Sequence, residues 1–247
     1  MLPTERFSGR AHNYSNYRPD YPDTLLRFFQ EKFRLNQESK VADIGSGTGI
    51  LSAQLLQKGY QVFGVEPNAD MRQKAEEALG SHAGFVSITG TGEQTNLPDH
   101  SVNLVTVAQA FHWMDPATAK KEFHRILTPG GHIAILWNLH AQDSLFGQGY
   151  EALRSHYGMD YKKIRKSHEP DLASFFAPAT MEVVVFSHHI FLDLQGFQGQ
   201  IQSSSFMPQP GHPQFEEMME KAEQLFTTYQ ENGLVKIAYN TKLYYGS

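Results

Sequence analysis

The stretch with the clearest chemical content is "VADIGSGTGI", residues 41–50, in which an apolar run leads to an acid and then to alternating glycines. Glycines directly after a strand let a ligand approach the backbone closely. The dinucleotide fingerprint G-x-G-x-x-G is not met, because counting from Gly45 places Ile50 at the third glycine position. A phosphate-binding P-loop is also excluded, since no Gly-Lys-Ser/Thr follows. The loop therefore predicts a ligand site of another kind.

Two acidic residues accompany this loop and limit what it can bind. Asp43 directly precedes the glycines, so its carboxylate disfavours a pyrophosphate and favours a cationic ligand. Glu66 ends the next apolar stretch, 23 residues along the chain, and a carboxylate there can accept hydrogen bonds from both hydroxyls of a ribose. A ligand with a ribose, positive charge and no phosphate is S-adenosylmethionine, which carries a sulfonium and an ammonium. The spacing therefore indicates a site for this cofactor.

The elements that position these residues follow a regular alternation as far as about residue 138. Apolar runs of strand length lie at 40–44, 61–66, 83–89, 101–109 and 132–138, and helical patterns lie at 24–33, 50–59, 69–79 and 117–127. This alternation predicts an α/β fold with a doubly wound, mostly parallel sheet and right-handed crossovers. The glycine loop then lies at the C-terminal edge of the sheet, where ligands bind in such folds.

The pattern changes after residue 138. We expect helices and loops over 139–180, a long strand over 181–194, a helix over 213–233 and a closing strand over 236–246. The two late strands are expected to form a hairpin-like antiparallel edge on the same sheet. The loop 202–213 is expected to cover a pocket.

Composition narrows the class of protein. The chain has 247 residues, of which 40% are hydrophobic, so it fits a globular protein with a sizeable core. The net charge of −5 argues against nucleic acid as a partner, since that needs a basic surface. The absence of cysteine excludes disulfides, thiolate catalysis and zinc–cysteine sites. No apolar run approaches the roughly 18 residues of a membrane span, and the first residues lack the plan of a signal peptide. We expect a cytoplasmic protein without a membrane partner, as a monomer or homodimer.

In combination, several segments resemble the class I S-adenosylmethionine-dependent methyltransferases. They are 41–49, 62–71, 89–115 ("TGTGEQTNLPDHSVNLVTVAQAFHWMD") and 122–138. The chain is similar to the small-molecule subgroup that includes ubiquinone-biosynthesis and trans-aconitate methyltransferases. The opening "FSGRAHNYSNYRPDYP" and the late "GQIQSSSFMPQPG" and "YNTKLYYG" resemble one branch of that subgroup, mostly of unassigned substrate.

The resemblance implies a Rossmann-like, seven-stranded sheet with a C-terminal antiparallel strand, in a single methyltransferase domain over 1–247. Within it, 1–22 would be a lid segment, 38–138 the cofactor-binding core, and 139–247 the acceptor side with the last two strands. The implied activity is methyl transfer from S-adenosylmethionine to a small-molecule acceptor, which leaves S-adenosylhomocysteine and needs no metal.

The resemblance also implies roles for particular residues. The loop residues Gly45, Ser46, Gly47 and Gly49 would lie against the methionine part of the cofactor, with Asp43 near its ammonium, and Glu66 would hold the ribose. Pro67, Asn68 and Met71 would border one edge of the adenine, Thr91, Gly92 and Glu93 the other, and Gln109 and Ala110 would lie under the methionyl chain. Arg18 or Tyr14 would meet the carboxylate. Many relatives have an acid where Thr91 stands, so adenine binding is expected to depend more on the backbone of Gly92.

His112, in "AQAFHWMD" (108–115), is the candidate base or acceptor-orienting residue. Methyl transfer is an in-line displacement on an activated sulfonium, and alignment of the reactants alone can contribute roughly 7–11 kcal/mol. A base is needed only where the acceptor loses a proton, and histidine suits that task near neutral pH. The alternative is that His112 and Trp113 only pack, while Asp115 caps the helix that begins at Pro116.

Other interpretations remain open. A nicotinamide oxidoreductase is disfavoured by the missing third glycine and by Asp43. A protein that holds the cofactor without catalysis is not excluded. A methyltransferase that acts on RNA or protein is disfavoured by the acidic balance of the chain. The opening segment with Tyr14, Tyr17 and Arg18 can be read as an ordinary polar arm instead of a lid. The basic run 161–166 is read as a solvated face in preference to a substrate-steering patch.

No metal site is indicated. Adjacent strand residues such as His188 and His189 face opposite sides, and the twelve scattered histidines do not form a ligand set. The aromatic residues Trp113, Trp137, Phe206 and Tyr17 are compatible either with a flat or apolar acceptor or with packing. The sequence does not identify the acceptor.

Overall fold

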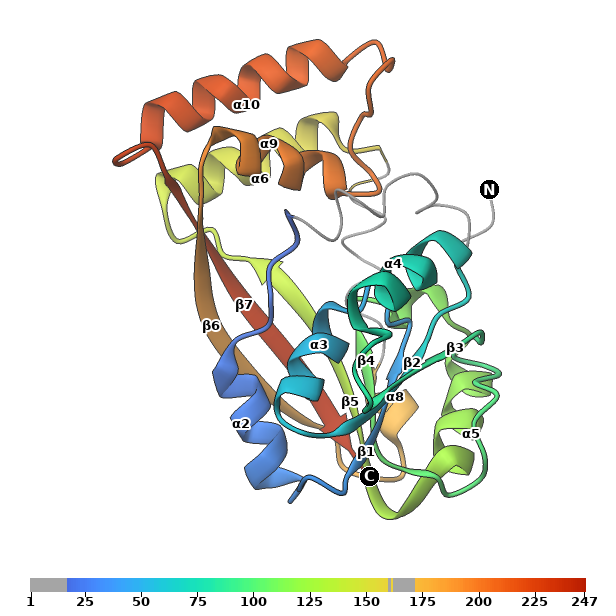
Figure 1. The fold of residues 1–247 in the computed structure, drawn as a ribbon. Helices are drawn as coiled ribbons and strands as arrows, with labels where there is room; N and C mark the ends of the chain where they lie inside the picture. Colours follow the sequence, from blue (N-terminus) through green and yellow to red (C-terminus); the bar gives the residue numbers. More distant parts are fainter. Residues whose placement is uncertain (1–16, 160, 162–171) are drawn as a thin grey trace.

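The computed structural model describes residues 17–159, 161 and 172–247 (Figure 1). Its centre is one seven-stranded sheet with the order β3-β2-β1-β4-β5-β7-β6. The strands are β1 (Lys40–Ile44), β2 (Gln61–Val65), β3 (Phe85–Ile88), β4 (Val102–Ala108), β5 (Leu127–His140), β6 (Glu182–Leu192) and β7 (Val235–Gly246). β7 is antiparallel to both of its neighbours, and the pairs among β1 to β5 are parallel. The expected α/β fold with an antiparallel C-terminal strand is confirmed.

Helices cover both faces of this sheet and one end of it. They are α2 (Asp23–Lys32), α3 (Ile50–Gln57), α4 (Ala69–Leu79), η2 (Phe111–Trp113), α5 (Pro116–Ile126), α6 (Leu145–Tyr157), α8 (Leu172–Phe176), α9 (Leu194–Ser203) and α10 (Phe215–Tyr229). Buried side chains of α2 and α3 pack on one face, and those of α5 and α8 pack on the other. Figure 1 shows α6, α9 and α10 as a separate layer, which we call the helical cap.

The helical cap has a hydrophobic core of its own. Phe146, Tyr150, Phe197 and Met218 are buried there, together with Tyr239 of β7. Because the far ends of β6 and β7 run up into this core, the cap is attached to the sheet by its antiparallel edge. The cap therefore lies beside the C-terminal edge of the parallel strands (Figure 1).

Side-chain caps fix the starts of the helices nearest the glycine loop. The Asn68 side chain accepts a hydrogen bond from the Met71 N–H at the start of α4. Asp115 accepts from the Thr118 N–H at the start of α5, with Pro116 at the first helical position, so the expected cap is confirmed. None of the helices in the described part of the chain has the length and apolar composition that crossing a lipid bilayer requires.

The structure differs from the sequence expectations mainly in the second half. β5 begins at Leu127, before the strand expected over 132–138; its pairing with β4 shifts register between Leu127 and His132, where Gly130 has φ +79°. α9 was not expected, and its sequence LQGFQGQIQS has little helical preference. Burial makes it a helix: Phe197 and Ile201 are fully buried, and a side chain on Gly199 would collide with the Tyr17 ring.

Candidate functional site

The glycine loop joins β1 to α3 and uses its three glycines differently. All three have positive φ, +68° at Gly45, +58° at Gly47 and +85° at Gly49, a region that side chains disfavour. A Cβ atom built on Gly45 would lie 2.5 Å from the Ala110 Cβ, and one on Gly49 would lie 2.7 Å from the Leu79 Cδ1. At Gly47 no atom of the described residues, its chain neighbours aside, lies within 4 Å of such a Cβ. Packing therefore requires two of the three loop glycines, and of the three only Gly47 faces open space among the described residues.

Glu66 connects this loop to the end of β2. Its Oε2 accepts a hydrogen bond of 2.9 Å from the Gly47 N–H, and its Oε1 accepts one of 2.8 Å from the Asn68 N–H. The side chain is largely buried, and burial raises the pKa of its carboxyl, an effect that the two N–H donors oppose. The carboxylate expected to bind a ribose thus lies directly beside the one open glycine.

Asp43 lies on the interior side of the loop. The Ser52 hydroxyl donates to its Oδ2 at 2.7 Å, and the Thr106 hydroxyl donates to its Oδ1 at 2.9 Å. Only 1% of the residue is exposed, and burial raises its pKa to about 6. The carboxylate therefore joins β1, α3 and β4 inside the fold, and its two oxygens are engaged by hydroxyls instead of facing the open side of the loop.

The turn after β3, which contains Thr91, Gly92 and Glu93, forms a second side of the candidate site, apart from the glycine loop. The Thr91 hydroxyl accepts hydrogen bonds from the N–H groups of Glu93 and Gln94, each at 3.2 Å, so it stabilises the turn. The Glu93 carboxylate accepts a hydrogen bond of 2.7 Å from the Asp115 N–H. These contacts hold the turn against the start of α5.

Met114 lies between the glycine loop and the turn after β3. A Cβ atom built on Gly92 would be 3.0 Å from the Met114 Cε, and one built on Gly45 would be 3.7 Å from the same atom. Sequence reasoning missed this residue, although it lies in the block "AQAFHWMD". Of the residues expected to border an adenine, Asn68 and Met71 are buried in the first turn of α4, whereas Pro67 is half-buried.

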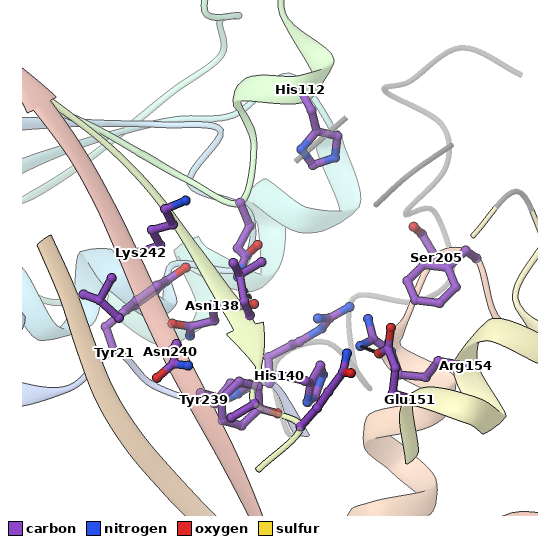
Figure 2. Close-up of a pocket in the computed structure, with 18 of the residues that line it drawn as sticks. Tyr21, His112, Asn138, His140, Glu151, Arg154, Ser205, Tyr239, Asn240 and Lys242 are labelled. Atoms are coloured by element: carbon purple, nitrogen blue, oxygen red, sulfur yellow. Dashed lines mark hydrogen bonds and ion pairs between the residues drawn. The ribbon is translucent and has the colours of Figure 1, made fainter. Parts of the chain in front are cut away.

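A cavity of about 560 Å³ opens next to the glycine loop, between the ends of β4 and β5 and the helical cap (Figure 2). Its wall on the loop side includes Ile50 at the start of α3, Gln109 and His112. Gln109 directly follows β4 and has φ +60°, and its side-chain amide donates to the Asn138 carbonyl at 3.4 Å. The half-buried His112 ring lies 4.4 Å from the Trp113 ring, centroid to centroid. The structure therefore places the candidate base in the wall of this cavity.

The opening segment reaches the same cavity in part. Arg18 lines it and donates from Nη2 to the Ser203 carbonyl at 3.3 Å. Tyr17 packs on α9 against Gly199, and Tyr14 lies outside the described residues, as does most of the basic run 161–166. Phe206 from the loop 202–213 also lines the cavity, in agreement with the expectation that this loop covers a pocket.

The far end of the cavity is formed by residues that sequence reasoning missed. They are His140 at the end of β5, Glu151 and Arg154 on α6, and Tyr239 on β7. Figure 2 shows His112 on one side and His140, Glu151 and Arg154 on the other. No motif marks them, because they come from three separate segments that only the fold brings together.

The remaining candidate residues from the sequence analysis have structural roles. Trp137 is 1% exposed and packs against Tyr244, so it belongs to the core. His188 stacks on Tyr239, while the exposed His189 contacts Phe191, which confirms that the adjacent histidines face opposite sides. Among the described residues, no group of three potential metal ligands occurs.

Comparison with known proteins finds similar chains among methyltransferases. Residues 42–135 match a family described as a methyltransferase domain. An uncharacterized methyltransferase of Mycobacterium tuberculosis is 36% identical over 132 residues, which are 53% of this chain and 51% of that protein. The chain thus spans about half the length of the curated relatives it matches.

Solved structures show the same fold. A protein of Anaeromyxobacter dehalogenans, provisionally assigned as a type II methyltransferase, has a TM-score of 0.68 at 20% identity, over 93% of this chain and 97% of that one. The phosphoethanolamine N-methyltransferase 2 of Haemonchus contortus has a TM-score of 0.54 at 14% identity, over 97% of this chain and 56% of that one. The latter was solved with S-adenosylhomocysteine and phosphomonomethylethanolamine. At these identities the similarity concerns the fold alone.

Proposed function

We propose that the chain contains a class I S-adenosylmethionine-dependent methyltransferase domain, and that it methylates a small-molecule acceptor held in the cavity beside the glycine loop. The observation that carries the proposal is the pairing of Gly47 with Glu66. An open glycine at positive φ beside a buried carboxylate is a suitable cradle for the ribose and methionine parts of the cofactor. The cavity begins at the same loop, with Ile50 in its wall.

Glu66 is suited to bind a ribose while it keeps its hydrogen bonds to the backbone. Each of its oxygens accepts one backbone N–H, which leaves further acceptor capacity for hydroxyl donors. The backbone of Ser46 and Gly47 would lie along the methionine part, and Pro67 and Ala110 would border the nucleoside. When bound, the cofactor supplies a sulfonium methyl group as the electrophile.

Asp43 would act through its charge instead of by direct contact. Its pKa of about 6 leaves it mostly ionised at pH 7, and a buried negative charge below the loop favours a cationic ligand above it. Met114 is assigned to the cofactor site as well, because its flexible thioether lies between Gly45 and Gly92. Since the Thr91 hydroxyl is used within its own turn, adenine binding would depend on the backbone there.

The chemical step requires alignment more than a set of catalytic groups. The walls of the cavity would hold the acceptor so that its lone pair faces the methyl carbon, forming the new bond as the carbon–sulfur bond breaks. His112 would take the proton from an acceptor that must lose one, since its ring lies in the cavity wall. A cavity of about 560 Å³ suits a small acceptor. We accordingly divide the chain into a cofactor core, 38–138, and an acceptor side, 139–247.

The test is titration calorimetry with S-adenosylmethionine, S-adenosylhomocysteine and NAD. We expect binding of the first two only, and Glu66→Ala should weaken it by about 10- to 100-fold, the loss of one or two hydrogen bonds to a charged group. The matched control is Glu77→Ala on the exposed side of α4, which should bind like the wild type. Binding of NAD, or equal affinities in wild type and Glu66→Ala, would contradict the proposal.

A further inference from the structure

The cavity has two chemically different ends. The end near the glycine loop is formed by Ile50, Gln109 and His112, whereas the far end contains Arg154, His140 and aromatic rings of the helical cap (Figure 2). The proposed transfer of the methyl group uses the first end only. The far end therefore needs a separate explanation.

Arg154 is held in place but is incompletely satisfied. Its guanidinium lies 5.3 Å above the rings of both Tyr161 and Phe206, and only 14% of the side chain is exposed. Its Nη1 lies 3.3 Å from the Glu151 Oε2, but its buried Nε has no hydrogen-bond partner among the described residues. Glu151 is shared, because it also accepts a hydrogen bond from the Tyr161 hydroxyl. A buried N–H of a charged group without an acceptor is unusual and points to a missing ligand.

His140 gives a second, independent sign. Its Nδ1 is buried without a hydrogen-bond partner among the described residues, between the rings of Tyr150 and Tyr239. Burial lowers the pKa of His140 well below its usual value, and the charges of Arg154 and Arg18 lower it further. Both charges that act on this ring are positive, so the imidazole is neutral in a positively charged environment.

The charges around the cavity leave a positive balance. Among the described residues that line it, three are cationic, Arg18, Arg154 and Lys242, and two carry carboxylates, Glu151 and the exposed Asp143. Glu151 compensates part of the charge on Arg154. The excess therefore corresponds to about one unit, which suits a monoanion.

We propose that the methyl acceptor is a small organic acid whose carboxylate binds at the far end, against Arg154 and His140, while its reacting atom faces Gln109 and His112. A guanidinium binds a carboxylate through parallel N–H donors, and Nε is one of the donors that such a pair uses. The aromatic rings around Arg154 would contact the carbon skeleton of the acid. This inference rests on the proposed methyl transfer, because it takes the glycine-loop end as the reacting end.

The experiment uses acid and amide pairs of equal shape. Calorimetry of the whole protein saturated with S-adenosylhomocysteine would compare 3-phenylpropanoate with 3-phenylpropanamide and hexanoate with hexanamide, and would include inorganic phosphate. We expect at least one acid to bind ten or more times tighter than its amide. In Arg154→Gln this preference should fall below about twofold, and in Arg154→Lys, which keeps the charge, it should be intermediate.

Glu151→Gln separates ligand binding from packing. It removes the resident carboxylate that competes for Arg154, so acids should bind tighter, whereas damage to the helical cap would weaken acids and amides alike. Arg27→Gln, an exposed arginine on α2 with 60% side-chain exposure, is the control and should not change the preference.

Each outcome has one meaning. Acids that bind no better than their amides, or a preference that survives Arg154→Gln, would overturn the inference and leave the methyl transfer intact. Phosphate binding that depends on Arg154 without any acid preference would overturn it in favour of a phosphorylated acceptor. A protein that fails to bind S-adenosylhomocysteine in the first step would refute the proposed function itself.

Discussion

Gly45 and Gly47 have nearly the same backbone conformation but different surroundings, and this difference gives a prediction. Alanine at either position costs about 1–2 kcal/mol of stability, because its Cβ disfavours positive φ. At Gly45 the new methyl would also overlap with Ala110, so Gly45→Ala should lower the free energy of unfolding further than Gly47→Ala. Denaturant unfolding of both variants measures this order.

Ligand affinity should separate the same two variants. Because Gly47→Ala places a methyl group in the open space beside Glu66, it should weaken S-adenosylhomocysteine binding at least tenfold in a folded protein. Equal stability of the two variants would contradict the overlap at Gly45, and undiminished binding by Gly47→Ala would show that the open space at Gly47 is not the cofactor site.

At this scale the sequence was informative only where residues act near one another in the chain. The loop with Gly47 and the acid at Glu66 follow from local spacing, since both lie at the ends of adjacent parallel strands. The sequence did not indicate which way the Asp43 carboxylate points, because the hydroxyls that bond to it, those of Ser52 and Thr106, come from two other elements. Arg154 and His140 carry no local signal, since neither is part of a motif.

Helices α4 and α5 both begin with a side-chain cap, but the caps have different neighbours: Asn68 hydrogen-bonds to Glu66, and Asp115 hydrogen-bonds to Glu93. Asn68→Ala and Asp115→Ala should each lower the free energy of unfolding by about 1 kcal/mol, the usual value for a lost N-cap. Only Asn68 adjoins Glu66, so only its loss should also weaken S-adenosylhomocysteine binding, by a few-fold. Unfolding curves and calorimetry on the two variants test this, and equal effects on binding would remove α4 from the site.

Among the elements, prediction succeeded where the local pattern and the burial agree. α4 has the expected bounds, and the strands β1, β2 and β4 lie within one or two residues of the expected ones. α9 was not predicted, because its glutamines and glycines have weak helical preference. The helix depends on the burial of Phe197 and Ile201 in the helical cap. That cap is assembled from α6, α9 and α10, which are far apart in the sequence.

For the molecule as a whole, the two faces of the sheet and the helical cap form three hydrophobic clusters, and the cavity lies where the third meets the sheet. In the proposed arrangement the parallel core holds the glycine loop, while the cap and its antiparallel strands present side chains to the acceptor. The acceptor is therefore expected to depend on the cap, and the cofactor on the core.

Asp43 lies where the stability of the core and the charge below the cofactor meet, so its titration should be visible in the stability of the whole protein. Its pKa is about 6 in the folded protein and close to 3.8 when exposed, so the folded state binds the proton more tightly. Its contribution to stability is therefore largest below about pH 4 and is lost as the pH rises to about 6, by up to roughly 3 kcal/mol at 1.36 kcal/mol per unit.

Asp43→Asn removes this titration, so the stability of the wild type relative to the variant should fall between pH 4 and 6 and stay level above it. Urea unfolding at a series of pH values measures this difference, in which the other titrating groups cancel. The variant should also bind S-adenosylmethionine more weakly at pH 7, because the buried negative charge is gone. A stability difference that does not change with pH would show that Asp43 titrates normally, and its assigned effect on a cationic cofactor would then need another source.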